Sequence, residues 1–389
     1  MQEEKQLLPE LRFPEFEEIW KQKKLGEICK IQTGNKDTQD KEENGLYPFY
    51  VRSNTIESIN SYSFDEQAIL TSGDGAGVGK IYHLVDGKFD LHQRVYALTN
   101  FDSNFSIRYT YHFFSEKFYK RVMRLSAKNS VDSVRRDMIF DMKMPYPNKE
   151  EQQKIANFLT AIDTQIQTLE KKKNLLEQYK KGVMQKIFKQ ELRFKDEDGN
   201  DFAEWKKKKL GDLTYKVGKK NKENIQYPIY SINNQEGFRP QSEQFDGLDS
   251  NERGYDISMY KIVYEKTFAY NPARINVGSI GYSYDLNEVI ISSLYVCFKT
   301  NEELEDLYLL AYLDTDRFNK DILRYQEGGV RQYLFYENFS QIKIPLPSNE
   351  EQTKIANFLS ALDKNIALVN TKIEKTKAYK KGLLQQMFV

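Results

Sequence analysis

Two long stretches of the chain carry apolar side chains at alternating steps of four and three residues. In the stretch 155–187, eight of the ten positions on these steps are apolar, and the two exceptions are lysines. In the stretch 355–387, eight of ten are again apolar, and the exceptions are a threonine and a lysine. This spacing is typical of a helix that buries one narrow seam against another helix. The pattern therefore predicts two long helices that pair as a coiled coil.

The two stretches are copies of one sequence. Residues 150–188 align with 350–388 at a constant offset of 200, with 19 of 39 positions identical, and both copies begin with Glu-Glu-Gln. Prolines precede both copies, at 145 and 147 and again at 345 and 347. Because proline disfavours a helix interior and acids suit the positive end of a helix dipole, each helix is expected to begin at its Glu-Glu-Gln. Identities off the seam, such as Asn157 and Gly182, argue against two unrelated amphipathic helices.

The regions before the helices also repeat, but only at isolated anchors. The triplet Leu11-Arg12-Phe13, then Trp20 and Lys24-Leu25-Gly26, returns as Leu192-Arg193-Phe194, Trp205 and Lys209-Leu210-Gly211. Tyr47-Pro48-Phe49-Tyr50 returns as Tyr227-Pro228-Ile229-Tyr230. Between these anchors the halves diverge almost completely. The expected segments are a lead-in at 1–20, a globule at 21–148, a helix at 149–190, a second lead-in at 191–209, a second globule at 210–347 and a helix at 348–389.

Both globules are predicted to be rich in β-strands. Short apolar runs lie between Gly, Asn, Asp and Pro residues, at 81–85, 95–98, 262–264, 289–291 and 295–298. A helical stretch is expected near the end of each globule, at about 107–125 and 303–324.

The composition is that of a folded protein with room for two domains. Of the 389 residues 39% are hydrophobic, and 26 Tyr and 24 Phe argue against disorder. No apolar signal region begins the sequence and no run of 18 apolar residues occurs, so the chain is expected in the cytoplasm without a membrane partner. Cys29 and Cys297 are expected to be reduced core residues.

The charge distribution says more than the net charge of +1. The blocks 150–189 and 350–389 each carry +3, which leaves −5 for the rest of the chain. DNA binding by this chain would therefore depend on local clusters or on a basic partner.

Catalytic motifs are absent or incomplete. The glycine-rich run 72–80 has Asp74 and Ile81 where a phosphate loop needs glycine and a hydroxyl. Asn271-Pro272-Ala273-Arg274 is similar to the Asn-Pro-Pro-aromatic motif of DNA amino-methyltransferases, but it lacks the second proline and the ring that stacks on a flipped base. The three histidines, His83, His92 and His112, have no metal-ligand spacing. We therefore predict a non-catalytic chain without a metal site.

Polar side chains gather in the divergent loops, and Arg, Gln, Asn and Ser are the types that read base edges. At an offset of 199 the loop at 72–80 corresponds to the loop beginning at Tyr270, and Val134-Arg135 is taken as equivalent to Val330-Arg331. The candidate DNA contacts are Ser72, Asp74, Lys80, Gln93, Arg94, Lys128, Asn129, Ser133, Arg135 and Arg136 in the first half, and Asn233, Asn234, Asn271, Arg274, Asn276, Ser292, Ser293, Arg324, Gln326, Arg331, Gln332 and Tyr333 in the second.

The whole arrangement resembles the specificity subunit of type I restriction–modification enzymes. The resemblance rests on the repeated K-x-P-x-P-x-x-E-E-Q-x-K-I-A-x-F-L, on the long helices ending Tyr-Lys-Lys-Gly, and on the lead-ins ending W-x₃-K-L-G. It implies an α+β fold in which two β-rich α/β target recognition domains form a pseudo-twofold repeat, separated by an antiparallel coiled coil. It also implies that each domain reads half of a split site on double-stranded DNA and that the helices set the spacer.

The resemblance implies partners and cofactors as well. Two methyltransferase subunits would dock on the helices and methylate adenine, and restriction subunits would complete the nuclease. This chain would bind no cofactor, whereas its partners would use S-adenosylmethionine and ATP with Mg²⁺. The seam and subunit-interface residues Ile155, Leu159, Ile162, Ile166 and Leu169 are expected to pack against Ile355, Leu359, Leu362, Ile366, Val369 and their neighbours. The alternatives are a coiled-coil adaptor for protein ligands and a fused methyltransferase, which the missing cofactor motif opposes.

Overall fold

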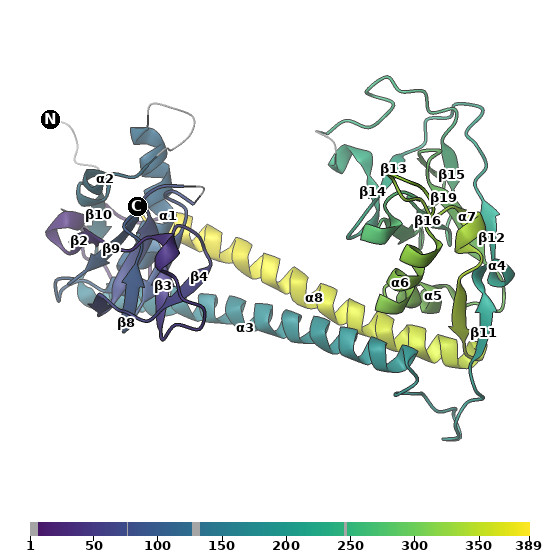
Figure 1. Ribbon diagram of the computed structural model, residues 1–389. Coiled ribbons are helices and arrows are strands. Elements are labelled where there is room, and N and C mark those ends of the chain that lie inside the picture. The colour runs from purple at the N-terminus through teal and green to yellow at the C-terminus, as the bar shows by residue number, and fades with distance from the viewer. Residues whose placement is uncertain (1–6, 76, 127–132, 245–246) are drawn as a thin grey trace. The chain divides into compact units, whose positions relative to one another are not determined.

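Figure 1 shows the computed structural model of the chain, which describes residues 7–75, 77–126, 133–244 and 247–389. The chain forms two compact units, of which the first comprises 1–171 with 369–389 and the second comprises 172–368. The points of division lie inside the two long helices, α3 (Lys149–Phe188) and α8 (Asn349–Met387). Each unit therefore contains one globule together with part of each long helix.

The globule of the first unit contains two four-stranded sheets, in the orders β2-β9-β6-β7 and β4-β3-β8-β5. Only β3 and β8 pair in parallel, and the other neighbours are antiparallel. The strands are β2 (Lys30–Thr33), β3 (Tyr47–Tyr50), β4 (Ile56–Ile59), β5 (Phe64–Asp65), β6 (Ala68–Ser72), β7 (Tyr82–Val85), β8 (Lys88–Leu91) and β9 (Val95–Thr99), and the helices are α1 (Ile107–Leu125) and α2 (Arg136–Phe140).

The globule of the second unit has the same topology, with the orders β12-β19-β16-β17 and β14-β13-β18-β15. Again only the pair β13 and β18 is parallel. The strands are β12 (Thr214–Val217), β13 (Ile229–Asn233), β14 (Gly237–Pro240), β15 (Lys261–Val263), β16 (Phe268–Tyr270), β17 (Ile280–Tyr282), β18 (Val289–Ile291) and β19 (Val296–Thr300), and the short helices are α4 (Leu210–Leu213) and α7 (Tyr336–Phe339). The expected α+β class, with two similar β-rich globules and two long paired helices, is confirmed.

The helix expected near 303–324 is divided in two. Helix α5 (Asp306–Leu313) ends before Thr315, whose hydroxyl accepts the backbone N–H of Phe318 and so caps α6 (Asp316–Tyr325). A threonine side chain that satisfies a free N–H is a strong helix start, and this explains the break. The corresponding α1 of the first unit is continuous.

One of the two prolines before each long helix belongs to a strand, which the sequence pattern did not predict. Strand β1 (Lys21–Lys24) pairs with β10 (Lys143–Tyr146), and β11 (Lys206–Lys209) pairs with β20 (Lys343–Leu346), as separate two-stranded sheets. Pro145 and Pro345 lie within β10 and β20. A strand with only one neighbour tolerates proline because one of its edges needs no N–H donor.

The repeated glutamates join each lead-in to a long helix. Glu151 is fully buried, and Arg12 donates two hydrogen bonds to its carboxylate, both of 2.8 Å. The indole N–H of Trp20 lies 3.4 Å from the same carboxylate. In the second unit the equivalent contacts are made by Glu351, which accepts from Arg193 at 3.1 and 2.8 Å and from Trp205 at 2.8 Å. A bidentate Arg–carboxylate contact is among the stronger polar interactions, so each lead-in is held firmly.

The repeated glutamines join each helix to its own globule. The side-chain oxygen of Gln152 accepts the backbone N–H of Ser106 at 2.9 Å, and its amide group donates to the carbonyl of Pro147 at 3.0 Å. Gln352 makes the same contacts with Glu305, at 2.8 Å, and with Pro347, at 3.1 Å. The Glu-Gln pair therefore repeats because each copy performs the same structural task in its own unit.

Within each unit the long helices run antiparallel. In the first unit Asp163 and Glu170 of α3 pair with Lys380 and Lys377 of α8, at 2.5 and 2.7 Å. In the second unit Lys180 pairs with Asp363 at 2.6 Å. Larger numbers on α3 thus meet smaller numbers on α8, as an antiparallel coiled coil requires.

The expected partners of the seam residues were wrong. Ile155, Leu159, Ile162 and Ile166 share a core with the last residues of α8, which are Leu383, Met387 and Phe388. Ile355 and Leu359 share the other core with Val183, Met184, Ile187 and Phe188, and Leu362 packs against it. Val369 is buried, and Leu169 and Ile366 are half-buried. Antiparallel pairing reverses the order of one helix, so the first seam residues of α3 meet the last of α8.

Among the described residues, none of the helices is both long and apolar enough to cross a membrane.

Candidate nucleic-acid interface

Five segments of the first unit meet at what we term the first loop surface, made of residues 34–37, 52, 72–75, 92–94 and 133–135. Backbone hydrogen bonds of 2.7 Å hold it together, from Gly73 to the carbonyl of Arg94, from Val134 to that of Gly73, and from Gln93 to that of Lys36. Asp74 and Ser133 also form an isolated antiparallel bridge. The candidates Asp74, Gln93, Arg94 and Ser133 are therefore brought together.

Two arginines flank one carboxylate on this surface. Asp74 lies 3.2 Å from a guanidinium nitrogen of Arg52 and 3.7 Å from one of Arg94. Both arginines are largely exposed, whereas Asp74 is half-buried. The shared carboxylate keeps two guanidinium groups close together without covering them. Such groups suit the bidentate recognition of phosphates or of guanine.

A buried histidine supports the neighbouring turn. The backbone N–H of Arg94 donates to Nδ1 of His92 at 2.9 Å, and Nε2 of the same ring lies 3.5 Å from the carboxylate of Asp37. Burial lowers the pKa of His92, which favours the neutral ring that can accept this N–H. The amide of Gln93 also donates to Asp37, at 3.1 Å. His92 thus orients Gln93 and Arg94 without being exposed itself.

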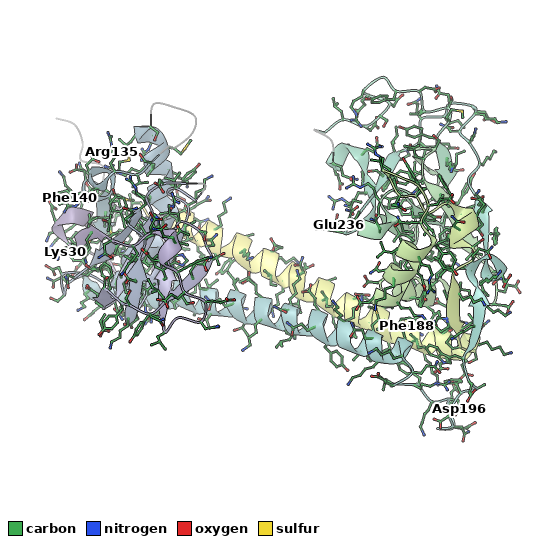
Figure 2. All side chains as sticks on the ribbon, viewed as in Figure 1. Lys30, Arg135, Phe140, Phe188, Asp196 and Glu236 are labelled. Carbon is green, nitrogen blue, oxygen red and sulfur yellow. The ribbon has the colours of Figure 1, made fainter. Side chains whose placement is uncertain are left out.

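The other candidates of the first unit have different surroundings. Ser72 is buried and its hydroxyl donates to the carbonyl of Asp74, so it shapes the loop. The ammonium of Lys80 lies 4.9 Å from the centre of the Tyr119 ring. Arg135, labelled in Figure 2, is exposed beside Asp137. Arg136 is exposed as well, but it donates to the carbonyl of Ile31 at 3.2 Å and lies 5.7 Å from the centre of the Phe140 ring, so it is engaged within its own unit. Lys128 and Asn129 lie outside the described residues.

The second unit has an equivalent second loop surface, made of residues 232–236, 271–279, 292–295 and 326–334. The backbone N–H of Leu334 donates to the carbonyl of Pro272 at 3.0 Å, which corresponds to the bond from Val134 to Gly73 in the first unit. The hydroxyl of Ser279 donates to the carbonyl of Ile232 at 2.9 Å.

This correspondence corrects one expected equivalence. Val134 matches Leu334, not Val330, because both donate to the same point of the neighbouring loop. Both are buried, whereas Val330 is fully exposed. In the second unit, reciprocal backbone bonds between Glu327 and Tyr333 close a hairpin that contains Val330 and precedes Leu334.

Arg274 is exposed on the second loop surface. Asn271 shapes this loop, because its side-chain oxygen accepts the N–H of Ala273 and its carbonyl accepts that of Arg274. Burial raises the pKa of Tyr295, and the charge of Arg274 partly opposes this rise. The hydroxyl of Tyr295 in turn accepts the backbone N–H of Ile232 at 3.2 Å.

The other candidates of the second unit divide into exposed and structural groups. Asn234, Asn276, Ser293, Arg331 and Gln332 are exposed on the second loop surface. Three of the remaining candidates make local contacts. Asn233 accepts the N–H groups of Gln235 and Glu236, Ser292 accepts that of Leu294, and Tyr333 stacks on Phe335. Gln326 is half-buried, and Arg324 lies at the end of α6.

Arg52 and Lys36 belong to the first loop surface but were missed in the sequence. Arg52 follows the repeated Tyr-Pro-x-Tyr anchor by two residues, and the matching stretch of the second unit contains Asn233, which was singled out. The position after a repeated anchor was thus an available signal. Lys36 carried no such signal, because only the fold places its carbonyl against Gln93.

Within the part of the chain that the structure describes, no three His, Cys, Asp or Glu residues come together in a way that could hold a metal ion. Burial raises the pKa of the Cys29 thiol to about 12 and that of the Cys297 thiol to about 11, which leaves both thiols protonated at neutral pH.

Comparison with known proteins identifies the family. The model for the type I restriction modification DNA specificity domain matches residues 17–178 and 203–378, one match for each copy of the repeat. The chain belongs to this family. Its relatives include the type I restriction enzyme MjaVIII specificity subunit of Methanocaldococcus jannaschii, 25% identical over 96% of this chain and 92% of that protein.

Other relatives are matched over less of their length. The EcoDI specificity subunit of Escherichia coli is 27% identical over 42% of this chain, and the putative MjaX specificity subunit of M. jannaschii is 28% identical over 68% of it. The chain spans 37% and 63% of these two relatives, respectively. Among solved structures, the type I S subunit from M. genitalium matches with a TM-score of 0.64 at 16% identity, over 98% of this chain and 99% of that one. This likeness confirms the fold.

Proposed function

We propose that each globule of this specificity subunit reads one half of a bipartite DNA site. The observation that carries the proposal is that the two loop surfaces share a backbone arrangement but differ in their exposed side chains. Each loop surface contains one equivalent backbone bond, donated by Val134 in the first and by Leu334 in the second, yet the two surfaces present different polar groups. The first presents Arg52, Gln93 and Arg94, and the second presents Arg274, Asn276 and Arg331. A constant frame with different donors is suited to reading two different base sequences.

We further propose that the paired helices bind two copies of one methyltransferase subunit and that their length sets the spacer. Apolar side chains are exposed on the helices outside the seam. Tyr179 of the second unit is 54% exposed and its repeat equivalent in the first unit, Tyr379, is 58% exposed. Leu175 and Leu368 are exposed as well, but their repeat equivalents are Lys375 and Thr168, so of these side chains it is the tyrosine that is repeated. A surface written twice suits a partner that is bound twice, and exposed aromatic groups are common anchors of such interfaces.

The partners would supply what this chain lacks. Outside the helices the chain carries −5, which is unfavourable for approach to a phosphate backbone. A methyltransferase with a basic surface would close around the DNA, methylate adenine and bind S-adenosylmethionine, and restriction subunits would add ATP-dependent cleavage with Mg²⁺.

The decisive experiment is a duplex gel-shift assay with the purified chain, the methyltransferase subunit, and both together. We expect a shift only with both. The variant Arg94→Ala/Arg274→Ala should still assemble but lose sequence preference, whereas Tyr179→Ala/Tyr379→Ala should fold but fail to assemble. A complex that assembles and never shifts DNA would instead favour a protein adaptor.

A further inference from the structure

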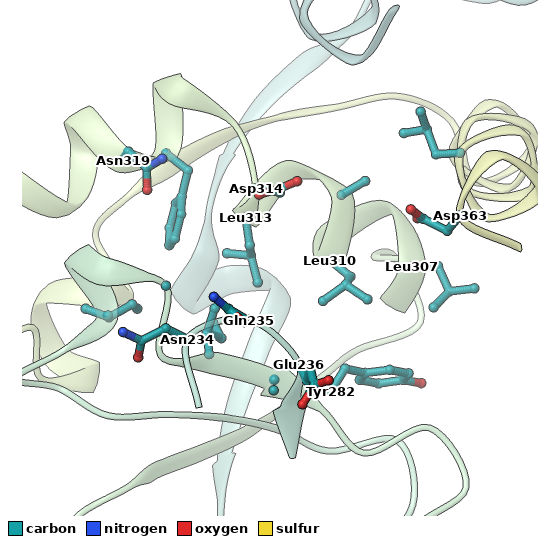
Figure 3. A pocket seen from close by; sticks show the side chains of 18 of the residues that line it. Asn234, Gln235, Glu236, Tyr282, Leu307, Leu310, Leu313, Asp314, Asn319 and Asp363 are labelled. Carbon is teal, nitrogen blue, oxygen red and sulfur yellow. The ribbon is translucent and has the colours of Figure 1, made fainter. Parts of the chain in front are cut away.

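The second unit contains a cavity of about 550 Å³ that the proposed DNA contacts do not explain. Figure 3 shows Leu307, Leu310 and Leu313 of α5 at this cavity, with Asp363 of α8 nearby. Other wall residues are Asn234, Gln235, Asn276, Tyr282, Ala311 and Ser360. The volume lies in the range of small-ligand sites, and the walls combine the leucines of α5 with many polar and charged groups.

In the first unit a side chain occupies the position that corresponds to the cavity of the second unit. The hydroxyl of Tyr109 donates to the carbonyl of Pro145 at 2.9 Å, and that of Tyr308 donates to Pro345 at 2.8 Å. These bonds align α1 with α5 at an offset of 199. By this alignment His112 of the first unit corresponds to Ala311, which lines the cavity.

His112 is a buried ring held against α3. Its Nε2 lies 3.4 Å from the hydroxyl of Thr160, and its Nδ1 lies 3.9 Å from the carboxylate of Asp163. Burial lowers the pKa of His112 to about 3, with smaller contributions from Lys380 and Arg108, so the ring is neutral. The first unit thus fills the place with a neutral nitrogen heterocycle from its own chain.

The polar groups around this ring are repeated in the second unit. Asp163 pairs with Lys380 at 2.5 Å, and Asp363 pairs with Lys180 at 2.6 Å. Ser360 stands where the first unit has Thr160. The Asp163 side chain is 28% exposed beneath the ring, whereas the Asp363 side chain is 56% exposed. The second unit therefore keeps the aspartate, the lysine and the hydroxyl, but it has Ala311 where the first unit has the His112 ring.

We infer that this cavity binds a planar nitrogen heterocycle, whose ring takes the place of His112 against Ser360 and Asp363. The cavity is larger than one imidazole ring, so the ligand extends along the leucine wall, and the amides of Asn234 and Asn276 are available to its polar substituents. The ring comes either from a free small molecule or from a side chain of a bound protein. The ligand would share Asn234 and Asn276 with the second loop surface, whereas Ser360 and Asp363 are separate from the proposed DNA contacts.

Saturation-transfer NMR of the full chain with 4-methylimidazole tests the inference. We expect a signal for the native chain and at least a tenfold weaker one for Ala311→His, which supplies the ring that the first unit has. Leu323→His is the matched control, because Leu323 is 68% exposed on α6, and it should keep the signal. Absence of a signal from the native chain, retention of it by Ala311→His, or an equal signal with methylammonium would overturn the inference.

The reciprocal variant strengthens the test. His112→Ala should open a matching cavity in the first unit, and 4-methylimidazole should raise its Tm more than that of the native chain. If His112→Ala does not fold, the Ala311→His comparison still decides. Addition of the methyltransferase subunit distinguishes the sources, since displacement of 4-methylimidazole indicates a protein side chain and retention indicates a free molecule.

Discussion

Replacement of Arg12 by alanine should destabilise the first unit by removing the partner of a buried charge. Glu151 has no exposed surface, and Arg12 supplies both of its short hydrogen bonds. After the replacement only the indole N–H of Trp20 remains, at 3.4 Å. Loss of one member of a buried ion pair costs about 3–5 kcal/mol. The Arg12 side chain is 14% exposed, so water can reach the site and a value near 3 kcal/mol is expected.

The second unit provides an internal comparison. Glu351 keeps a 2.8 Å bond from Trp205 when Arg193 is removed, and the Arg193 side chain is 23% exposed. Arg193→Ala should therefore cost less than Arg12→Ala. The double variant Arg12→Ala/Glu151→Gln should recover much of the loss, because glutamine leaves no charge buried.

Urea unfolding followed by tryptophan fluorescence measures these differences directly. The two tryptophans of the chain, Trp20 and Trp205, each contact one of the buried glutamates, so the fluorescence reports on the contacts themselves. An unchanged unfolding midpoint for Arg12→Ala would show that the buried pair does not stabilise the first unit. A double variant no more stable than Arg12→Ala alone would show that the buried charge is not the cause of the loss.

Three further predictions concern the seam, pH and cofactor. Leu159→Ala and Leu359→Ala should each cost about 2–5 kcal/mol in urea unfolding, and the exposed Leu175→Ala should cost less than about 0.5 kcal/mol; unchanged seam variants would refute the coiled coil. Burial lowers the pKa of His112 from 6.5, its ordinary value, to about 3 in the folded chain. Protons therefore bind the unfolded chain first, so the free energy of unfolding is highest above pH 6.5 and decreases as the pH falls below that value. At pH 5.5 the loss should be about 1.4 kcal/mol, and His112→Phe should flatten this part of the stability profile. Calorimetry of the isolated chain with S-adenosylmethionine should show no stoichiometric binding, since the sequence lacks a methyltransferase cofactor motif. A binding isotherm with one ligand per chain would contradict this.

Periodicity and repetition were sufficient to predict the long helices and the two similar globules. Seam positions follow the step of four and three, and the structure buries or half-buries all of them. The partners of Ile155 and Ile355 could not be predicted correctly, because the pattern shows which face is buried but not which end it meets. The sequence pattern marks Pro145 as a helix stop but does not show that it lies in a strand. Its strand pairs with the one that contains Gln22, and the sequence pattern does not show a pairing between segments so far apart in the chain.

Side-chain types in the divergent loops indicated where the polar surfaces lie, but not how they are organised. The shared contact of Asp74 with two arginines depends on three loops that are distant in sequence. Ser72 has the same side-chain type as exposed Ser133, and only burial distinguishes them. The cavity beside Ala311 could not be predicted, because its walls come from α5, α8 and loops that are distant in sequence.

Mapping of methylated adenines tests the central claim most directly. The native chain, Arg94→Ala and Arg274→Ala would each be expressed with the methyltransferase subunit, and the methylated sites would be sequenced. We predict a bipartite motif with a fixed gap, in which Arg94→Ala relaxes one half and Arg274→Ala relaxes the other by about 1–3 kcal/mol at one base position. A single continuous motif, a changed gap, or loss at the same half in both variants would contradict independent reading by the two globules.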